Sequence, residues 1–596
     1  MLTVESNQTI SALIRRLWNY LPQRRRNQFL ALLVFTVIAS FAEIFSIGAV
    51  LPFLSVLVAP DHVFAHPAAA PFIQKFGWTS AHQLLLPLTL LFGVAAVVSG
   101  AARLSLLWAN TRLCSAAGAD LSIDIYRRTL YQPYEVHVAR NSSEVINAIS
   151  TKINSFIYII TMLMTLISSV VMLFAILFAL LAVDPVIALS AFGGFGLIYG
   201  GIAKLTRARL IENSRLVASE STQVVKSLQE GLGGIRDVLL DGSQAEYCTV
   251  YSNAVLPLRR AEASSAFIGT SPRFVVEALG MLLIAILAFS MAQPQNGIGM
   301  AIPVLGALAL GAQRLLPVLQ QAYGSWSAIR SGQISLKDVL DLLAQPMPDH
   351  IHLASHYEPM PFERSLKLRA VSFRYGPDLP WVVKGIDLSI RKSSRIGFIG
   401  PTGGGKSTLL DIVMGLLQPT EGWLEVDGMP VTIANQRAWQ RHVAHVPQSI
   451  FLADSSIAEN IAFGVPKDSI DHERVLHAAE QAQIAQLIDT LPQKYMTPVG
   501  ERGVRLSGGQ RQRIGIARAL YKQADVIIFD EATSALDGET EEAIMQSIEA
   551  LSGDLTVLLI AHRLSTLRNC SEIIEITKGD VRMVGSYQDL MNERNA

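Results

Sequence analysis

One stretch decides the fold of the C-terminal half of this chain: IGFIGPTGGGKSTLLDIV, residues 396–413. It joins an apolar strand to a helical run through a glycine-rich loop that ends in Lys406 and Ser407. Glycines let backbone N–H groups turn toward phosphate oxygens, and the N-terminus of the following helix adds positive potential. The order of strand, loop and helix therefore predicts a P-loop within a parallel α/β domain.

The P-loop predicts ATP and Mg²⁺ as cofactors. Lys406 supplies a mobile positive charge for the outer phosphates, and Ser407 offers a hydroxyl oxygen to Mg²⁺. The predicted nucleotide contacts of this loop are Gly400, Pro401, Thr402, Gly403, Gly404, Gly405, Lys406, Ser407 and Thr408.

A second apolar strand, residues 526–529, ends in the acidic pair Asp530 and Glu531. An acid at the carboxyl end of a buried parallel strand can face a P-loop and hold the water shell of the metal. The following carboxylate can polarise an attacking water. Alone, the pair could be a surface cap of the next helix. Beside a P-loop, we interpret Asp530 as a metal-site residue and Glu531 as catalytic.

Composition separates two domains in this chain of 596 residues, which is too long for one hydrophobic core. Charged residues make up 16%, below the ~25% usual for soluble proteins. The deficit lies in the N-terminal half, where six apolar runs are each long enough to cross a bilayer. They occupy residues 28–58, 84–108, 156–181, 185–203, 265–292 and 298–323. A net charge of zero argues against a nucleic-acid partner.

Basic residues predict the orientation in the membrane. They cluster before the first apolar run, between the second and third, and between the fourth and fifth, which places both termini in the cytoplasm. Cys114, Cys248 and Cys570 then lie on the cytoplasmic side and show no metal-ligand spacing. The external stretch 59–81 is compatible with a small interfacial helix and equally with a disordered loop.

These patterns divide the chain into four parts, with two long helical cytoplasmic loops inside the second. The parts are an N-terminal interfacial helix (1–27), a membrane domain (28–345) with cytoplasmic loops 109–155 and 204–264, a linker (346–362) and a nucleotide-binding domain (363–596). An apolar stripe at helical spacing, from Ile10 to Trp18, predicts that the first helix lies on the membrane surface.

The C-terminal domain resembles the ATP-binding-cassette (ABC) proteins in several ordered elements. The run Leu506-Ser507-Gly508-Gly509-Gln510 resembles their signature motif and lies just before Asp530 and Glu531. The remaining elements, in chain order, are similar to the adenine-stacking aromatic (Tyr375), the Q-loop glutamine (Gln448), an exporter-specific acid (Glu501), the D-loop (Ser534-Ala535-Leu536-Asp537) and the switch histidine (His562).

The resemblance implies an exporter half-transporter: six long membrane helices, of the domain-swapped exporter type, fused to a cytosolic α/β P-loop domain. It implies an ATP hydrolase coupled to transport that binds ATP between the P-loop of one subunit and the signature motif of another. Glu531, His562 and Gln448 would act in catalysis, and Ser407, Gln448 and Asp530 at the metal. Ser507, Gly508, Gly509 and Gln510 would contact nucleotide from the opposite subunit. Because the acidic residue Glu531 is intact, we expect a homodimer rather than a heterodimer.

Three arginines within the apolar runs give the first indication of a substrate. Arg103, Arg273 and Arg314 lie at a similar depth near the cytoplasmic ends of the second, fifth and sixth runs. They could form a cationic belt for an anionic lipid headgroup. They could instead extend to the membrane surface, and Arg273 could pair with Glu277 one turn away.

The membrane domain is also similar to flippases of bacterial lipid-linked oligosaccharides, in residues 40–54, 131–134 and 141–144. This resemblance implies export of a lipid-linked oligosaccharide or another anionic lipid across the bacterial inner membrane. A multidrug or peptide exporter of the same architecture is the alternative. A non-transporting ATPase or an ATP-gated channel would not explain both the six apolar runs and the catalytic residues.

Overall fold

The computed structural model describes residues 9–58, 64, 70–181, 185–291, 298–347, 360–531, 538–550, 555–561 and 564–595. Its internal contacts divide the chain into two compact units. The first comprises Met1–Gln132 and Arg140–Met347, and the second comprises Pro133–Ala139 and Pro348–Ala596. Each unit is described separately.

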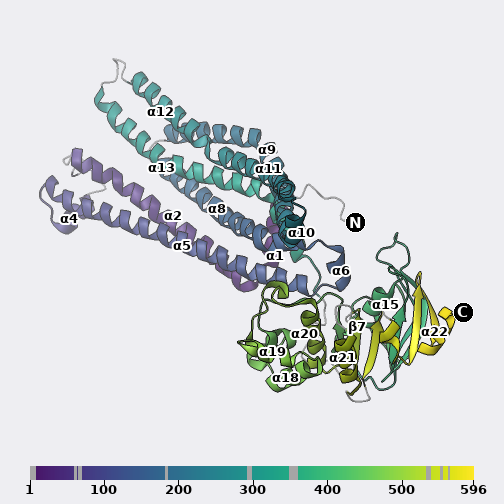
Figure 1. Ribbon diagram of the computed structural model, residues 1–596. Helices are drawn as coiled ribbons and strands as arrows, with labels where there is room; N and C mark the ends of the chain where they lie inside the picture. Colours follow the sequence, from purple (N-terminus) through teal and green to yellow (C-terminus); the bar gives the residue numbers. More distant parts are fainter. Residues whose placement is uncertain are drawn as a thin grey trace. The chain divides into compact units, whose positions relative to one another are not determined.

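The first unit is entirely helical in its described residues (Figure 1). Its helices are α1 (Ile10–Tyr20), α2 (Gln23–Val58), α4 (Ala70–Phe76), α5 (Leu85–Leu130), α7 (Ser142–Asn147), α8 (Ile153–Leu181), α9 (Pro185–Gly233), α10 (Ile235–Leu240), α11 (Gln244–Thr270), α12 (Pro272–Met291), α13 (Ile298–Ser331) and α14 (Gln333–Leu343), with a 3₁₀ turn at Ala81–Leu84 and a π-turn at Ala148–Lys152.

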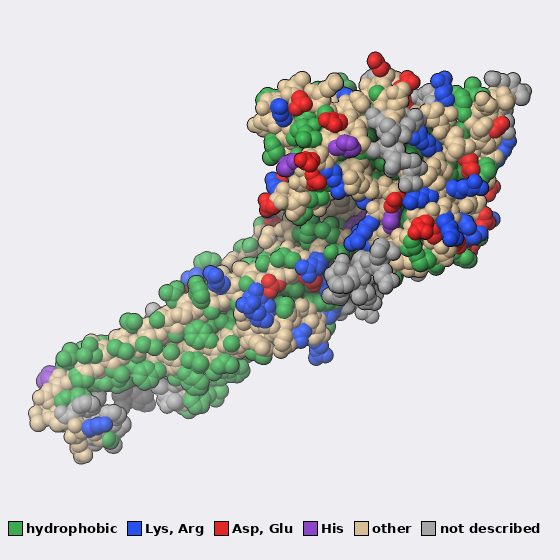
Figure 2. Space-filling view, turned by 90° about the horizontal axis from the view of Figure 1, so that it is seen from below, with side chains coloured by type: hydrophobic (Ala, Val, Ile, Leu, Met, Phe, Trp, Pro, Cys, Tyr) green, Lys and Arg blue, Asp and Glu red, His purple; other side chains and the backbone are tan. Residues whose placement is uncertain are grey.

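Several of these helices are much longer than a bilayer is thick. The 46 residues of α5 and the 49 of α9 span about 70 Å each at 1.5 Å per residue, against a hydrocarbon core of about 30 Å. Within the described residues, three segments are long and apolar enough to cross a membrane: Gln23–Ser46, Ala81–Leu130 and Ser142–Phe178. Of the other three predicted spans, 185–203 lies in α9, 265–292 begins at the end of α11 and continues through α12, and 298–323 lies in α13. Figure 2 shows hydrophobic side chains gathered along this helical unit.

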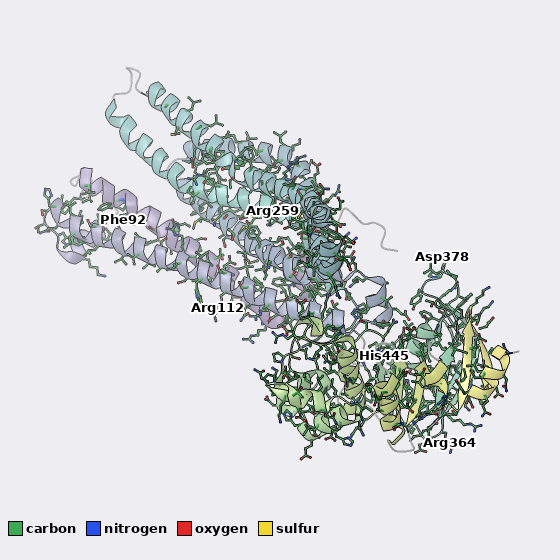
Figure 3. All side chains as sticks on the ribbon, in the orientation of Figure 1. Phe92, Arg112, Arg259, Arg364, Asp378 and His445 are labelled. Carbon is green, nitrogen blue, oxygen red and sulfur yellow. The ribbon has the colours of Figure 1, made fainter. Side chains whose placement is uncertain are left out.

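Helices α2 and α5 pack side by side and carry the N-terminal part of the unit (Figure 1). Phe53 of α2 stacks on Phe92 of α5 with ring centroids 5.0 Å apart. Arg112 lies 20 residues after Phe92 on the same helix, beyond the end of the apolar run (Figure 3). The guanidinium of Arg112 lies 5.8 Å from the ring of Trp108. The long helix therefore passes from an apolar segment into a polar one without a break.

Helix α1 forms within the predicted N-terminal segment, and protein covers its apolar stripe. Leu13 and Leu17 are buried in a core to which Leu340 and Leu343 of α14 contribute. Arg16 adds an ion pair of 2.9 Å to Asp341. The stripe predicted to lie on the membrane is therefore used for packing against the helix at the end of the membrane domain.

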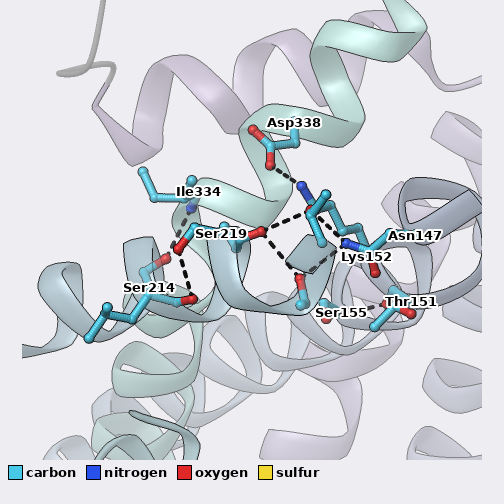
Figure 4. A network of polar contacts seen from close by, with 12 residues as sticks. Asn147, Thr151, Lys152, Ser155, Ser214, Ser219, Ile334 and Asp338 are labelled. Atoms are coloured by element: carbon cyan, nitrogen blue, oxygen red, sulfur yellow. Dashed lines mark hydrogen bonds and ion pairs between the residues drawn. The ribbon is translucent and has the colours of Figure 1, made fainter. Parts of the chain in front are cut away.

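A polar network ties the π-turn to α14 and α9 (Figure 4). Lys152 at the end of the turn pairs with Asp338 of α14, Nζ to Oδ2, at 2.5 Å. The amide of Asn147 donates to Ser221 and Thr222 of α9 at 3.1 and 3.0 Å. These contacts join the first long cytoplasmic loop to the second and to α14.

The second unit contains two sheets. The strands are β1 (Ser365–Phe373), β2 (Val383–Arg391), β3 (Arg395–Ile399), β4 (Glu421–Val426), β5 (Met429–Pro430), β6 (Val443–Val446), β7 (Val526–Asp530), β8 (Thr556–Ile560), β9 (Glu572–Thr577) and β10 (Asp580–Gly585). One sheet is antiparallel with order β2-β1-β4-β5, and the other has order β10-β9-β3-β8-β7-β6. In the second sheet β9, β3, β8, β7 and β6 are parallel.

Helices pack around these sheets. They are α6 (Tyr134–Ala139), α15 (Lys406–Val413), α16 (Gln436–Arg441), α17 (Ile457–Ile461), α18 (His472–Gln481), α19 (Ala485–Thr490), α20 (Gly508–Tyr521), α21 (Gly538–Ala550) and α22 (Tyr587–Asn595). Strand β3 lies between β9 and β8, and its Ile396 and Phe398 are fully buried. The parallel strands are therefore buried and end at one edge of the sheet, where α/β proteins bind ligands.

Candidate nucleotide-binding site

The glycine-rich loop follows β3 and leads into α15. Gly405 caps the helix with φ of +102°, a conformation that L-residues with a Cβ rarely adopt. A Cβ at Gly404 would lie 2.8 Å from the carbonyl oxygen of Ile576 on β9, so the loop also packs closely against its neighbour. Sequence and structure agree that glycine is required at these two positions.

Lys406 is buried at the first position of α15, with 7% of its surface exposed. Its ammonium donates to the carbonyl oxygens of Gly400 and Pro401 at 3.0 and 2.9 Å. A buried ammonium requires such partners. The loop thus holds the lysine over its own carbonyls, where phosphate oxygens can replace them.

The ends of neighbouring strands bring the catalytic candidates together. Gln448 follows β6, while Asp530 and Glu531 come at the end of β7, and β6 pairs with β7. The Gln448 amide donates to Glu531 Oε2 at 2.6 Å. The backbone of Glu531 has a φ of +50°, which is uncommon for a residue with a Cβ. The sequence placed Asp530 and Glu531 at the end of a strand, and the structure adds Gln448 at the neighbouring strand and its contact with Glu531.

Tyr375, after β1, reaches the same helix. Its hydroxyl lies 3.3 Å from Thr408 Oγ1 on α15, and its ring packs edge-on against Phe373. Nearly half of its surface is exposed, which leaves a ring face available for stacking. Tyr375 is therefore placed beside the P-loop helix, as the resemblance implies.

Asp411 is a site residue that sequence reasoning missed. Burial, and next to it the charge of Asp530, raise the pKa of Asp411 to about 6. It stands three residues after Thr408, on the same face of α15. This spacing was the signal available in the sequence. Burial and Asp411 together also raise the pKa of Tyr134 on α6.

Helix α6 contacts the nucleotide-binding unit near this point. The backbone N–H of Gln418 donates to Glu135 Oε1 at 3.4 Å. This short segment comes from the first long cytoplasmic loop, yet its contacts group it with the second unit.

The signature motif forms the N-terminus of α20. Ser507 is the N-cap: its hydroxyl accepts from Gln510 N at 3.2 Å, and Gln510 Oε1 accepts from Ser507 N at 2.8 Å. This reciprocal capping box satisfies two helix-end donors. Ser507 and Gly508 are exposed. The hydrogen bonds of the Ser507 side chain to described residues stay within its own turn, so the motif is preorganised on the surface rather than joined to the P-loop of the same chain.

Some predicted residues lie outside the described part of the chain. They are His562 and the four D-loop residues 534–537. Strand β8, which ends two residues before position 562 in the sequence, lies between β3 and β7.

The metal-site candidates have donor chemistry that suits Mg²⁺. The three are the hydroxyl of Ser407, the amide oxygen of Gln448 and the carboxylate of Asp530. All are hard oxygen donors, and Mg²⁺ in phosphate sites takes one or two carboxylates with phosphate and water oxygens. Ser407 and Gln448 are exposed, so both are accessible to a metal–nucleotide complex.

Two of the three membrane arginines are paired with carboxylates. Arg103 Nε on α5 lies 3.5 Å from Glu43 Oε2 on α2, and Ser99 donates a short hydrogen bond to the same oxygen. Arg273 donates to Glu277 one turn along α12 at 2.8 Å. Arg314 is in α13, with its side chain outside the described residues. The cationic belt stays a prediction, and carboxylates balance the charge of two of its three arginines.

Comparison with known proteins assigns both units. Residues 29–304 match the family described as ABC transporter transmembrane region, and residues 383–534 match the family described as ABC transporter. The chain is 28% identical over 596 residues to an ATP-dependent lipid A-core flippase of Ralstonia nicotianae, covering 97% of this chain and 94% of that one.

Two further comparisons agree. A flippase of the same name from Chromohalobacter salexigens is 31% identical over 460 residues, covering 77% of this chain and 76% of that one. The solved structure of a bacterial Atm1-family ABC exporter with ATP bound matches with a TM-score of 0.73 and 25% identity, covering 92% of this chain and 96% of that chain. With its helical membrane unit fused to an α/β nucleotide-binding unit, this chain belongs to the ABC transporters, as an exporter half-transporter that couples ATP hydrolysis to transport across a membrane.

Proposed function

We propose that two copies of this chain form a flippase for an anionic lipid, such as a lipid-linked oligosaccharide, in the bacterial inner membrane. The observation that carries this proposal is the similarity, along nearly the whole chain, to proteins named lipid A-core flippases. The resemblance of residues 40–54 to lipid-linked oligosaccharide flippases supports the same class of substrate.

A homodimer explains the distribution of the site residues. One chain supplies one P-loop, with Gln448 and Glu531 beside it, and one preformed signature motif that is exposed at Ser507. Two identical chains facing each other would complete two sites. The half-transporter architecture itself requires a second half, and no residue of the described nucleotide site points to a degenerate partner.

The described side chains support the following course of hydrolysis. Phosphate oxygens take the place of the Gly400 and Pro401 carbonyls at the Lys406 ammonium, since charge-assisted hydrogen bonds are the stronger ones. Gln448 holds the Glu531 carboxylate in one orientation, and Glu531 accepts a proton from the attacking water. Bound Mg²⁺ would neutralise charge on the phosphates.

The proposed orientation can be tested with the native cysteines. Cys248 on α11 is exposed, whereas Cys114 and Cys570 are buried. We expect a membrane-impermeant thiol reagent to label Cys248 in inverted membrane vesicles but not in intact spheroplasts. Labelling of Cys248 from outside, with Cys248→Ser as the blank, would contradict a cytoplasmic α11.

The substrate class can be tested by ATPase stimulation in proteoliposomes. We expect an anionic glycolipid to raise turnover and to be moved between leaflets, with Glu531→Gln as the inactive control. Stimulation by peptides or cationic drugs, with none by anionic lipids, would instead establish the peptide or multidrug alternative.

A further inference from the structure

Two adjoining cavities lie within the helical unit. The larger, of about 860 Å³, is lined mainly by α5, α8, α11 and α13, with one residue each from α9 and α14. The smaller, of about 490 Å³, lies between α9, α11, α12 and α13. They share Gly269, Thr270 and Gly324 in their walls. A Cβ at Gly324 would lie 3.8 Å from the Gly269 carbonyl oxygen, so α11 and α13 approach closely at the junction. Both volumes are within the range of ligand sites.

The wall of the larger cavity is rich in uncharged polar groups. Among its described lining residues Glu262 is the one charged side chain, and it is paired with Arg259 at 2.8 Å. The hydroxyls of Thr161, Thr165 and Thr270 donate to carbonyls one turn back on their own helices, at 2.8 to 2.9 Å. Their oxygen lone pairs therefore remain as acceptors.

Amide groups add donors to the same wall. Gln321 accepts a hydrogen bond from Ser169 at 3.2 Å through its oxygen, and Asn110 accepts from Cys114 through its oxygen. Within the described residues, no hydrogen bond uses the NH₂ group of Gln321 or Asn110. A wall that offers both donors and acceptors without net charge suits a ligand with many hydroxyls, since each hydroxyl both donates and accepts.

The smaller cavity contains an unpartnered hydroxyl. Tyr199 is 7% exposed, and its hydroxyl is buried without a hydrogen-bond partner among the described residues. A buried polar group without a partner is unfavourable, because it has lost its hydrogen bonds to water. The neighbouring Tyr323 is satisfied, because its hydroxyl lies 3.2 Å from Thr206 Oγ1. Tyr199 is thus the group of this cavity that a ligand would satisfy.

Arg273 lines the same cavity and has donors to spare. Its Nε is held by Glu277 at 2.8 Å, and the two terminal nitrogens have no hydrogen bond to the described residues. A phosphate oxygen could accept from these nitrogens and from Tyr199. Because Glu277 balances the charge of Arg273, hydrogen bonding rather than net charge would carry most of the recognition.

From this juxtaposition, and resting on the proposed flippase function, we infer that the two cavities bind a sugar bonded to a phosphate, the headgroup of a glycophospholipid. The sugar occupies the larger cavity, lined by Thr270 and Gln321. The phosphate reaches Tyr199 and Arg273 in the smaller one. The site therefore distinguishes a glycosylated lipid from a bare lipid phosphate by neutral polar groups.

Equilibrium binding to the detergent-solubilised full-length protein tests the inference. The probes are a short-chain polyprenyl phosphate that carries a disaccharide and the same lipid phosphate without sugar. We expect Gln321→Leu to raise the Kd of the sugar-bearing probe about tenfold and to leave that of the bare phosphate within about twofold, because one hydrogen bond to sugar is lost. Tyr199→Phe raises both Kd values about tenfold.

Matched controls exclude general effects of these substitutions. We expect Thr270→Val, like Gln321→Leu, to weaken binding of the sugar-bearing probe alone. Thr89 is exposed and bonded to its own helix at 2.7 Å, as Thr270 is at 2.9 Å, so Thr89→Val is its control. Tyr251→Phe on α11 is the control for Tyr199→Phe. We expect neither control to change a Kd by more than about twofold. Unchanged melting temperatures of the variants exclude unfolding.

Each outcome is decisive. Any one of three results would overturn the inference. Gln321→Leu could affect binding of the two probes equally, Tyr199→Phe could leave binding of both unchanged, or the wild type could show no preference for the sugar-bearing probe. So would a Kd that rises more than about tenfold between about 0.1 and 0.5 M salt, because that dependence indicates a cationic site. Binding requires no turnover. A protein that binds the glycosylated probe but never moves it would contradict the proposed function alone, and one that flips anionic lipids without sugar preference would contradict this inference alone.

Discussion

Replacing Gln448 with methionine removes the amide that donates to Glu531 Oε2 at 2.6 Å. A hydrogen bond to a charged group contributes about 1.5–3 kcal/mol, which corresponds to about 10- to 150-fold in rate if the bond serves only to orient the carboxylate. Glu531→Gln removes the proton acceptor itself, and general base catalysis typically contributes 10²- to 10⁴-fold. We expect kcat for ATP hydrolysis to fall by these factors in the two single variants.

The double variant separates a shared action from independent ones. If Gln448 acts through Glu531, Gln448→Met with Glu531→Gln should be no slower than Glu531→Gln alone, since the bond has nothing left to orient. Steady-state ATPase activity in detergent measures all three, and nucleotide binding checks that each variant still takes up ATP. A Mg²⁺ titration of Gln448→Met tests its implied part at the metal separately. Effects that multiply in the double variant would refute the proposed orientation of Glu531 by Gln448.

Three further predictions concern other parts of the chain. The pKa of Asp411 is about 6 in the folded protein and 3.8 for an unperturbed aspartate, so its ionisation destabilises the fold progressively from about pH 4 to 6 and fully above that range. Asp411→Asn should therefore raise the melting temperature of the nucleotide-free protein at pH 8 but not at pH 4, and an equal gain at both pH values would contradict this. Ser507→Ala should lower stability by about 1 kcal/mol through loss of the N-cap, whereas Ser507→Asp should keep stability yet abolish hydrolysis; an active Ser507→Asp protein would contradict a phosphate-facing serine. Lys152→Met leaves Asp338 without its partner at 2.5 Å and should lower the melting temperature by several degrees. Adding Asp338→Asn to this variant should lower it little further, and additive losses in the double variant would argue against the ion pair.

The P-loop and the strands that carry its neighbours could be predicted from the sequence because their pattern is local, whereas the roles of the individual site residues stay predictions. A P-loop requires glycines, a lysine and a hydroxyl at fixed spacing, and the parallel strands carry Gln448 and Glu531 to one edge wherever the rest of the chain goes. What spacing could not show is which groups touch. The bond between Gln448 and Glu531 joins residues 83 positions apart.

The membrane unit was less predictable for the same reason. Arg103 was recognised as an intramembrane charge, but its pairing with Glu43 depends on how α2 and α5 pack. The Arg273–Glu277 pair lies within one helical turn, so the sequence did offer it as an alternative to the belt. The apolar stripe of α1 was visible, yet nothing in the sequence identified α14 as its partner. An amphipathic stripe shows that a face is covered without showing whether lipid or protein covers it.

The central claim is that each ATP site combines the P-loop of one chain with the signature motif of another, and a complementation experiment tests it most directly. Lys406→Ala and Ser507→Arg are each expected to be inactive alone, because each homodimer has two defective sites. Co-expressed in equal amounts, about half of the dimers contain one of each variant, and every such dimer has one intact site and one doubly defective site. If one intact site is enough for turnover, the account predicts that ATPase activity returns to as much as about a quarter of the wild-type value. Activity as low as in the separate variants, in dimers shown by differential tags to contain both chains, would contradict it.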